Sequence, residues 1–127
     1  MRGQNQLILM CFLATGAETS MQMNIPNEDA KGVIHALRFL KQAHSGVKID
    51  LGDRVAVIGG GNAAVDAARV AHRLGAKEVS IVYRRSRAEM PAVKTEVDEA
   101  EREGVKLHIL AAPVRVLTQN GQLTGIQ

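Results

Sequence analysis

A run of three glycines and a later arginine cluster are the residues of this 127-residue chain whose types and spacing could do chemistry. The run, Gly59-Gly60-Gly61-Asn62-Ala63-Ala64, fits the pattern G-x-G-x-x-A, and it stands between an apolar strand and an alanine-rich helix. The first glycine permits a sharp turn, and the second lets the backbone approach a pyrophosphate without an intervening Cβ atom. The cofactor-binding residues predicted here are Gly59, Gly60, Gly61, Asn62 and Ala63.

The arginine cluster follows about twenty residues later, where a dinucleotide site normally has its ribose-binding residue. A site for NAD(H) offers Asp or Glu at this point, and a carboxylate would repel a 2′-phosphate. This chain has Arg84, followed by Arg85 and Arg87, and guanidinium groups bind phosphate in a bidentate manner. The cluster therefore predicts NADP(H) as the ligand, the alternative being a solvated basic loop.

Other polar residues give no catalytic or metal site. Asp66 and Arg69 lie one turn apart on the expected helix and are expected to pair with each other. Tyr83 is followed four residues later by Arg87, so the Tyr-x-x-x-Lys pair of short-chain dehydrogenases is absent. Four histidines lack the spacing of metal ligands: His35, His44, His72 and His108.

The composition is that of one soluble globular domain, with 46% apolar residues and a mean hydropathy of −0.04. A net charge of +3 could favour nucleic acid, but aromatic residues make up 2% of the chain, too few for base stacking. We therefore expect no nucleic-acid partner. The single cysteine, Cys11, excludes an internal disulfide and favours a reducing, cytoplasmic setting.

The apolar run at residues 7–14 has two interpretations. With Arg2 before it and small residues after it, the run resembles a signal peptide, but it is too short to span a membrane. A buried strand explains the same residues better, and no membrane contact is expected.

Strands and helices then alternate along the chain, which favours a parallel sheet with helical crossovers. We expect helices at residues 30–44, 62–74 and 92–103. A cap near Asn27 would start the first helix, and Pro91 suits the first turn of the last one. Expected strands are residues 54–58, 78–83 and 105–110. After Pro113, strands at 114–118 and 123–126 flank Asn120-Gly121, a dipeptide typical of a type I′ turn. The fold class predicted is α/β, a Rossmann-like three-layer domain with a parallel sheet and a C-terminal antiparallel β-ribbon.

The edge of that sheet raises a further expectation. Strand 54–58 would lie bare at the edge, and a bare apolar edge invites pairing. Residues 7–14 could pair with it in parallel, with helix 30–44 as the crossover. Exchange of that strand between two chains would give a homodimer through the exposed sheet edge.

Three phrases together resemble the NADPH-binding domain of flavoproteins like the small subunit of glutamate synthase, which are FAD-dependent pyridine nucleotide-disulfide oxidoreductases. They are GGGNAAVDAAR, YRRSRAEMPA and an acidic helix ending in EGVKLHIL. Upstream, FLATGA and IPNEDAKGVIHALRFL resemble the exit from the family's FAD domain, with Asn27 where the family has glycine. The resemblance implies that residues 1–29 are a remnant of the FAD-domain exit strand and linker. It also implies that residues 30–127 are a truncated NADP(H)-binding domain.

In that family NADPH delivers hydride to FAD, and electrons pass on through iron–sulfur centres to a large-subunit or other acceptor. The resemblance thus implies an FAD domain and an iron–sulfur or large-subunit partner. No FAD glycine motif precedes Leu7 and no cysteine cluster is present, so we expect the chain to be inactive alone. The alternative is a non-catalytic nucleotide-binding or interaction module.

Overall fold

The computed structural model describes residues 25–27, 30, 32–46, 49 and 51–127. The elements, in chain order, are α1 (Ala36–His44), β1 (Arg54–Ile58), α2 (Asn62–Arg73), β2 (Glu78–Val82), the short 3-10 helix η1 (Arg87–Glu89), α3 (Lys94–Glu103), β3 (Lys106–His108), β4 (Val116–Gln119) and β5 (Gln122–Ile126).

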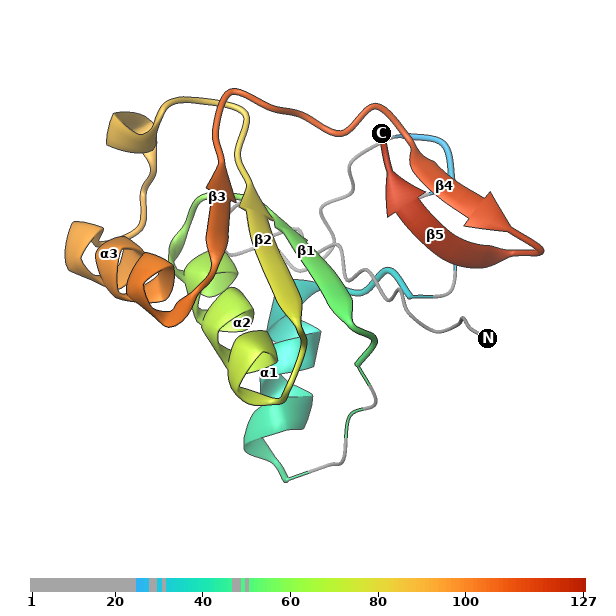
Figure 1. Cartoon of the computed structure of the whole chain (residues 1–127), viewed down its shortest axis with the longest axis horizontal. Helices are drawn as coiled ribbons and strands as arrows, with labels where there is room; N and C mark the ends of the chain where they lie inside the picture. The colour runs from blue at the N-terminus through green and yellow to red at the C-terminus, as the bar shows by residue number, and fades with distance from the viewer. Residues whose placement is uncertain (1–24, 28–29, 31, 47–48, 50) are drawn as a thin grey trace.

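The first three strands form a parallel sheet in the order β1-β2-β3. Helix α2 connects β1 to β2, and η1 and α3 connect β2 to β3. Figure 1 shows α2 against the sheet, and α2 also contacts α1 and α3. The carboxyl ends of β1 and β2 therefore lie together at one edge, where ligands bind in folds of this kind.

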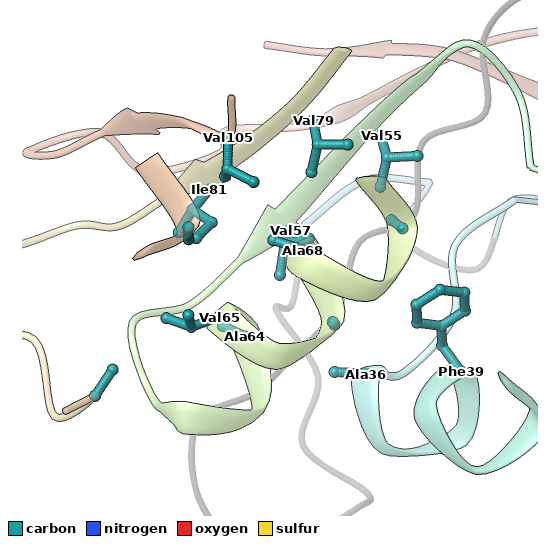
Figure 2. Close-up of a cluster of buried hydrophobic side chains, with 14 of the residues drawn as sticks. Ala36, Phe39, Val55, Val57, Ala64, Val65, Ala68, Val79, Ile81 and Val105 are labelled. Atoms are coloured by element: carbon teal, nitrogen blue, oxygen red, sulfur yellow. The ribbon is translucent and has the colours of Figure 1, made fainter. Parts of the chain in front are cut away.

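The main core lies between this sheet and α2 (Figure 2). Alternate residues of β1 and β2, which include Val57 and Ile81, turn towards the helix and are buried. The facing side of α2 consists of small residues, which lets helix and sheet approach closely. Its buried members are Ala64, Val65, Ala67, Ala68 and Ala71.

The intervening residues of the same strands face the other way and contact the C-terminal hairpin. Ile58 forms a second buried cluster with Val116 of β4 and Leu123 of β5, and Ala56 and Val82 pack against it. The molecule therefore has three layers: helices, parallel sheet and antiparallel ribbon. This arrangement confirms the fold class that the sequence predicts.

The turn of the hairpin has the conformation expected from its sequence. Asn120 has a φ of 56° and Gly121 a φ of 79°, and a type I′ turn requires positive φ at both positions. Strands β4 and β5 pair antiparallel on either side of it. The prediction of a C-terminal ribbon is thus confirmed.

Helix α1 starts later than the periodicity of the sequence suggests. The apolar spacing predicts a start at residue 30, but the helix begins at Ala36 with His35 as its N-cap. Residues before it contact the ribbon instead: Pro26 accepts a hydrogen bond from the Val116 N–H, and Asn27 Nδ2 donates to the Val116 carbonyl, each at 3.0 Å. Asn27 adopts a left-handed φ of 66°, a backbone conformation that glycine and asparagine adopt more readily than other residues.

Helix α3 also starts later than expected, at Lys94 rather than residue 92. The Ala92 N–H donates to the Gly60 carbonyl at 3.1 Å, and the Val93 N–H donates to Asn62 Oδ1 at 3.0 Å. Both donors thus bind the glycine turn, and the segment that includes Pro91 stays outside the helix. The helical spacing of residues 92–103 predicts that Val93 points inwards, but this residue is the N-cap of α3 and is 52% exposed.

The expected strand at residues 7–14 lies outside the described residues. Within the described ranges, β1 pairs with β2 alone, so pairing of residues 7–14 or of a second chain along its other edge stays a prediction. None of the helices in those ranges has the length and apolar content needed to cross a membrane.

Candidate functional site

The glycine turn lies at the carboxyl end of β1 and is anchored to the neighbouring strand. Gly59 has a φ of 137°, a conformation that residues with a Cβ rarely adopt. Its N–H donates to the Val82 carbonyl at 3.0 Å, which fixes the turn at the end of β2. The first glycine of the motif therefore has the steric role that the sequence assigned to it.

Helix α2 begins directly after the turn, with Gly61 as its N-cap and no side-chain cap. The first helical donors are the N–H groups of Ala64 and Val65, which both donate to the Gly61 carbonyl. The N–H groups of Asn62 and Ala63 precede them and have no acceptor inside the helix. They form the positive end of the helix dipole, where an anion is favoured.

A cleft of about 400 Å³ opens at this edge of the sheet. The whole glycine turn and Arg84 line it, so the structure brings together most of the residues that the sequence predicted. Arg85 and Arg87 are not among its lining residues. The lining consists of Ile58, Gly59, Gly60, Gly61, Asn62, Ala63, Val82, Tyr83, Arg84, Pro91, Ala111, Ala112 and Pro113.

Sequence reasoning missed the apolar part of this cleft. Tyr83 follows β2, and Ala111 and Pro113 lie beyond β3. The signal that could have found them is their position, because ligands in parallel sheets lie outside the carboxyl ends of the strands. An apolar surface with a few polar groups beside it is typical of small-molecule binding sites.

The three arginines are placed differently. Arg84 is exposed at the cleft and has no acidic partner within the part of the chain that the structure describes. The Arg85 guanidinium lies 3.6 Å from the Glu89 carboxylate. Arg87 pairs with Asp98 and Glu101 of α3, and the hydrogen bond to Glu101 raises its pKa.

Residues 84–89, here called the arginine loop, are held by several hydrogen bonds. Glu89 accepts from the Ser86 N–H at 3.2 Å and from its hydroxyl at 3.0 Å, and these bonds lower the pKa of the Glu89 carboxyl. The Tyr83 hydroxyl donates to the Glu89 carbonyl at 3.0 Å. The Leu110 N–H donates to the Arg85 carbonyl at 3.0 Å, which ties the loop to the segment after β3.

Arg69 links α2 to α3 instead of pairing with Asp66, so that expectation is wrong. Its guanidinium lies 2.8 Å from the Glu103 carboxylate and 2.7 Å from that of Glu96. The hydrogen bond from Arg69 lowers the pKa of Glu103. The Arg69 side chain is 16% exposed, so this ion pair is partly shielded from solvent.

Comparison with known proteins places the chain in a family. The profile of the pyridine nucleotide-disulphide oxidoreductases matches residues 3–126. The chain is 46% identical over 120 residues to the beta subunit of an NADPH-Fe(3+) oxidoreductase of Geobacter sulfurreducens, covering 91% of this chain and 18% of that protein. It is 37% identical over 129 residues to the small chain of the NADPH glutamate synthase of Escherichia coli, covering 91% of this chain and 27% of that protein.

Solved structures show the same fold. FprA from Mycobacterium tuberculosis, at 20% identity, superposes with a TM-score of 0.69 over 91% of this chain and 41% of its own. A pyridine nucleotide-disulphide oxidoreductase from Desulfovibrio vulgaris, at 14% identity, has a TM-score of 0.66 over 84% of this chain and 29% of its own. The chain spans less than a third of the two curated relatives. On the strength of the profile match and the resemblance to glutamate synthase small chains, this chain belongs to the pyridine nucleotide-disulphide oxidoreductase family.

Proposed function

We propose that this chain is the NADP(H)-binding part of a flavin-dependent oxidoreductase, in which hydride passes from NADPH to FAD. The observation that carries the proposal is that the glycine turn and Arg84 line one cleft, at the carboxyl ends of β1 and β2. The pyrophosphate and the 2′-phosphate of NADP(H) would then each meet a favourable group in the same cleft.

The residues of the turn fit the pyrophosphate. The left-handed Gly59 allows the backbone to turn, and the N–H groups of Asn62 and Ala63 are available as donors. The helix dipole contributes about 0.3–1 kcal/mol per exposed anion. Arg84 supplies a guanidinium to the 2′-phosphate, and Arg85 can join it because its 3.6 Å contact with Glu89 is weak.

The protein's part in the reaction is positional. Bound NADPH would supply the hydride, and the residues of this chain would hold the dinucleotide so that its nicotinamide ring meets the flavin. We assign residues 30–127 to the NADP(H)-binding domain and residues 1–29 to the exit from the FAD domain. FAD and a large-subunit or iron–sulfur acceptor would then be held elsewhere in the full-length enzyme. The relatives named for NADPH support this proposal.

Titration calorimetry with NADPH and NADH at low and high salt tests the proposal. We expect NADPH to bind more tightly, and its advantage to shrink at high salt because the 2′-phosphate contact is ionic. The Arg84→Ala variant should bind NADPH about tenfold more weakly, with little change for NADH.

Arg102→Ala is the matched control, because Arg102 is exposed on α3, pairs with Glu99 and does not line the cleft. It removes the same charge and should leave the preference intact. Equal losses for NADPH and NADH in Arg84→Ala would contradict the assignment of Arg84 to the 2′-phosphate.

A further inference from the structure

Arg87 is the arginine of the loop whose charge is already satisfied within the protein. Its Nη1 pairs with Glu101 and its Nη2 with Asp98, both on α3. None of these three residues lines the cleft. We infer, granting the proposed function, that Arg87 is a positioning residue that docks the arginine loop on α3 so that Arg84 can meet the 2′-phosphate.

The surroundings of the arginines support this division of roles. An anionic ligand that approached Arg87 would meet two carboxylates at the same guanidinium, and like charges repel. Arg84 has no such partner among the described residues and lines the cleft. Phosphate recognition therefore falls to Arg84, with Arg85 beside it.

The contacts also explain why the position of the loop matters. The bonds of Glu89 to Ser86 and of Leu110 to Arg85 set the internal shape of the loop. The ion pairs of Arg87 hold the arginine loop against α3. Figure 1 shows that the chain passes from β2 through η1 to α3.

Helix α3 is itself fixed to α2, because Arg69 pairs with both Glu96 and Glu103. Helix α2 begins at the glycine turn. A continuous set of contacts thus runs from the turn through both helices to the arginine loop. This set fixes the separation between the pyrophosphate site and Arg84.

The test uses two probes that differ in one phosphate, adenosine 2′,5′-bisphosphate and ADP, titrated into the 127-residue chain. The informative variant is Asp98→Asn/Glu101→Gln, which removes both partners of Arg87 and leaves the arginine in place. If Arg87 positions the loop, this variant and Arg87→Ala should each bind the bisphosphate about fivefold more weakly. Affinity for ADP should stay unchanged, and combining all three substitutions should cause no further loss.

The control is Glu99→Gln, which removes one acidic charge from α3 where it pairs with Arg102 rather than with the loop. Its affinity for both probes should match that of the wild type. Tighter binding of the bisphosphate by Asp98→Asn/Glu101→Gln would overturn the inference, since it would mean that a freed Arg87 contacts the phosphate. Equal losses for both probes would also overturn it, because they would indicate a general structural role.

The same titrations separate failure of the proposed function from failure of the positioning role. If the proposed function is wrong, the wild-type chain binds neither probe. If only the positioning role is wrong, the wild-type chain still binds both probes and the affinities of the variants depart from the expected pattern. Arg87→Lys provides a second check on the pairs. It should recover part of the bisphosphate affinity lost in Arg87→Ala, because lysine keeps the charge without the two-pronged geometry.

Discussion

Gly60 lies so close to Tyr83 that a Cβ atom on the glycine would stand 2.6 Å from the Cδ1 and Cε1 atoms of the ring. Real Cβ atoms essentially never approach another atom so closely. The middle glycine of the motif is therefore required by the tyrosine, in addition to any need of a ligand. Through its hydroxyl, Tyr83 also holds the Glu89 carbonyl of the arginine loop. Tyr83 thus joins the glycine turn to the arginine loop through two contacts.

Substitution of Gly60 by alanine should therefore disturb both halves of the site. Gly60→Ala forces the Tyr83 ring to move, and we expect it to lower the free energy of unfolding by about 1–3 kcal/mol, as overpacking does. It should also weaken NADPH binding. Denaturant unfolding followed by circular dichroism measures the first effect, and calorimetry the second.

Gly125→Ala is the control for that substitution. A Cβ atom at Gly125 would lie 3.5 Å from Leu117 Cδ1, an ordinary contact. This variant should lose less than about 1 kcal/mol and keep its affinity. Equal destabilisation of the two variants would show that the Tyr83 contact is not the cause.

Two substitutions of Asn62 separate its effect on the stability of the fold from its effect on NADPH binding. Its Oδ1 accepts a hydrogen bond from the Val93 N–H at 3.0 Å. Asn62→Asp keeps this acceptor and adds a negative charge beside the proposed phosphate site. We expect its stability to be retained, because an acidic residue in the first turn suits the helix dipole, while NADPH affinity falls about tenfold.

Asn62→Ala should show the other effect, a loss of about 0.5–1.5 kcal/mol in unfolding free energy from the missing hydrogen bond. Thermal unfolding of both variants, together with NADPH titration, distinguishes them. Unchanged NADPH affinity in Asn62→Asp would place the phosphates away from this residue.

Glu103 should make stability depend on pH in the acidic range. Its pKa in the folded protein lies below the ordinary value of 4.5, chiefly because of the hydrogen bond from Arg69. The stabilisation of the folded state by the ionised Glu103 carboxylate is therefore fully present above pH 4.5, and it is lost as the pH falls through the lowered pKa. Glu103→Gln should cost about 1 kcal/mol at pH 7 and progressively less below pH 4.5.

Urea unfolding of wild type and Glu103→Gln across this pH range checks the prediction. Glu99→Gln serves as the control, because Glu99 pairs with the exposed Arg102 on the same helix. A difference between wild type and Glu103→Gln that persisted undiminished at low pH would rule out the ionised carboxylate as its source.

Much of the fold could be predicted because local sequence and tertiary structure agree there. Strands β1 and β2 are short runs of β-branched residues, and α2 is a run of alanines between glycine turns. The start of α1 could not be predicted, because the apolar spacing after residue 30 is helical in period. Contacts between Asn27 and Val116, 89 residues apart, hold the preceding segment against the ribbon.

The candidate site could likewise be predicted only in part from the sequence. The glycine turn was predictable, since Gly59 needs its left-handed backbone whatever surrounds it. The arginines were predictable as a cluster, but their different pairing was not. Arg87 pairs with Asp98 and Glu101 of α3, a helix that packs beside α2. No spacing within the loop reveals that contact.

Amide chemical shifts, followed while NADPH is titrated into the isotope-labelled chain, would locate the nucleotide on the molecule. We expect the largest changes on the glycine turn, Gly59 to Ala63, and on Tyr83 and Arg84. The hairpin turn at Asn120 and Gly121 should stay unchanged. Shifts confined to other surfaces, or none at saturating NADPH, would show that the nucleotide does not bind in this cleft.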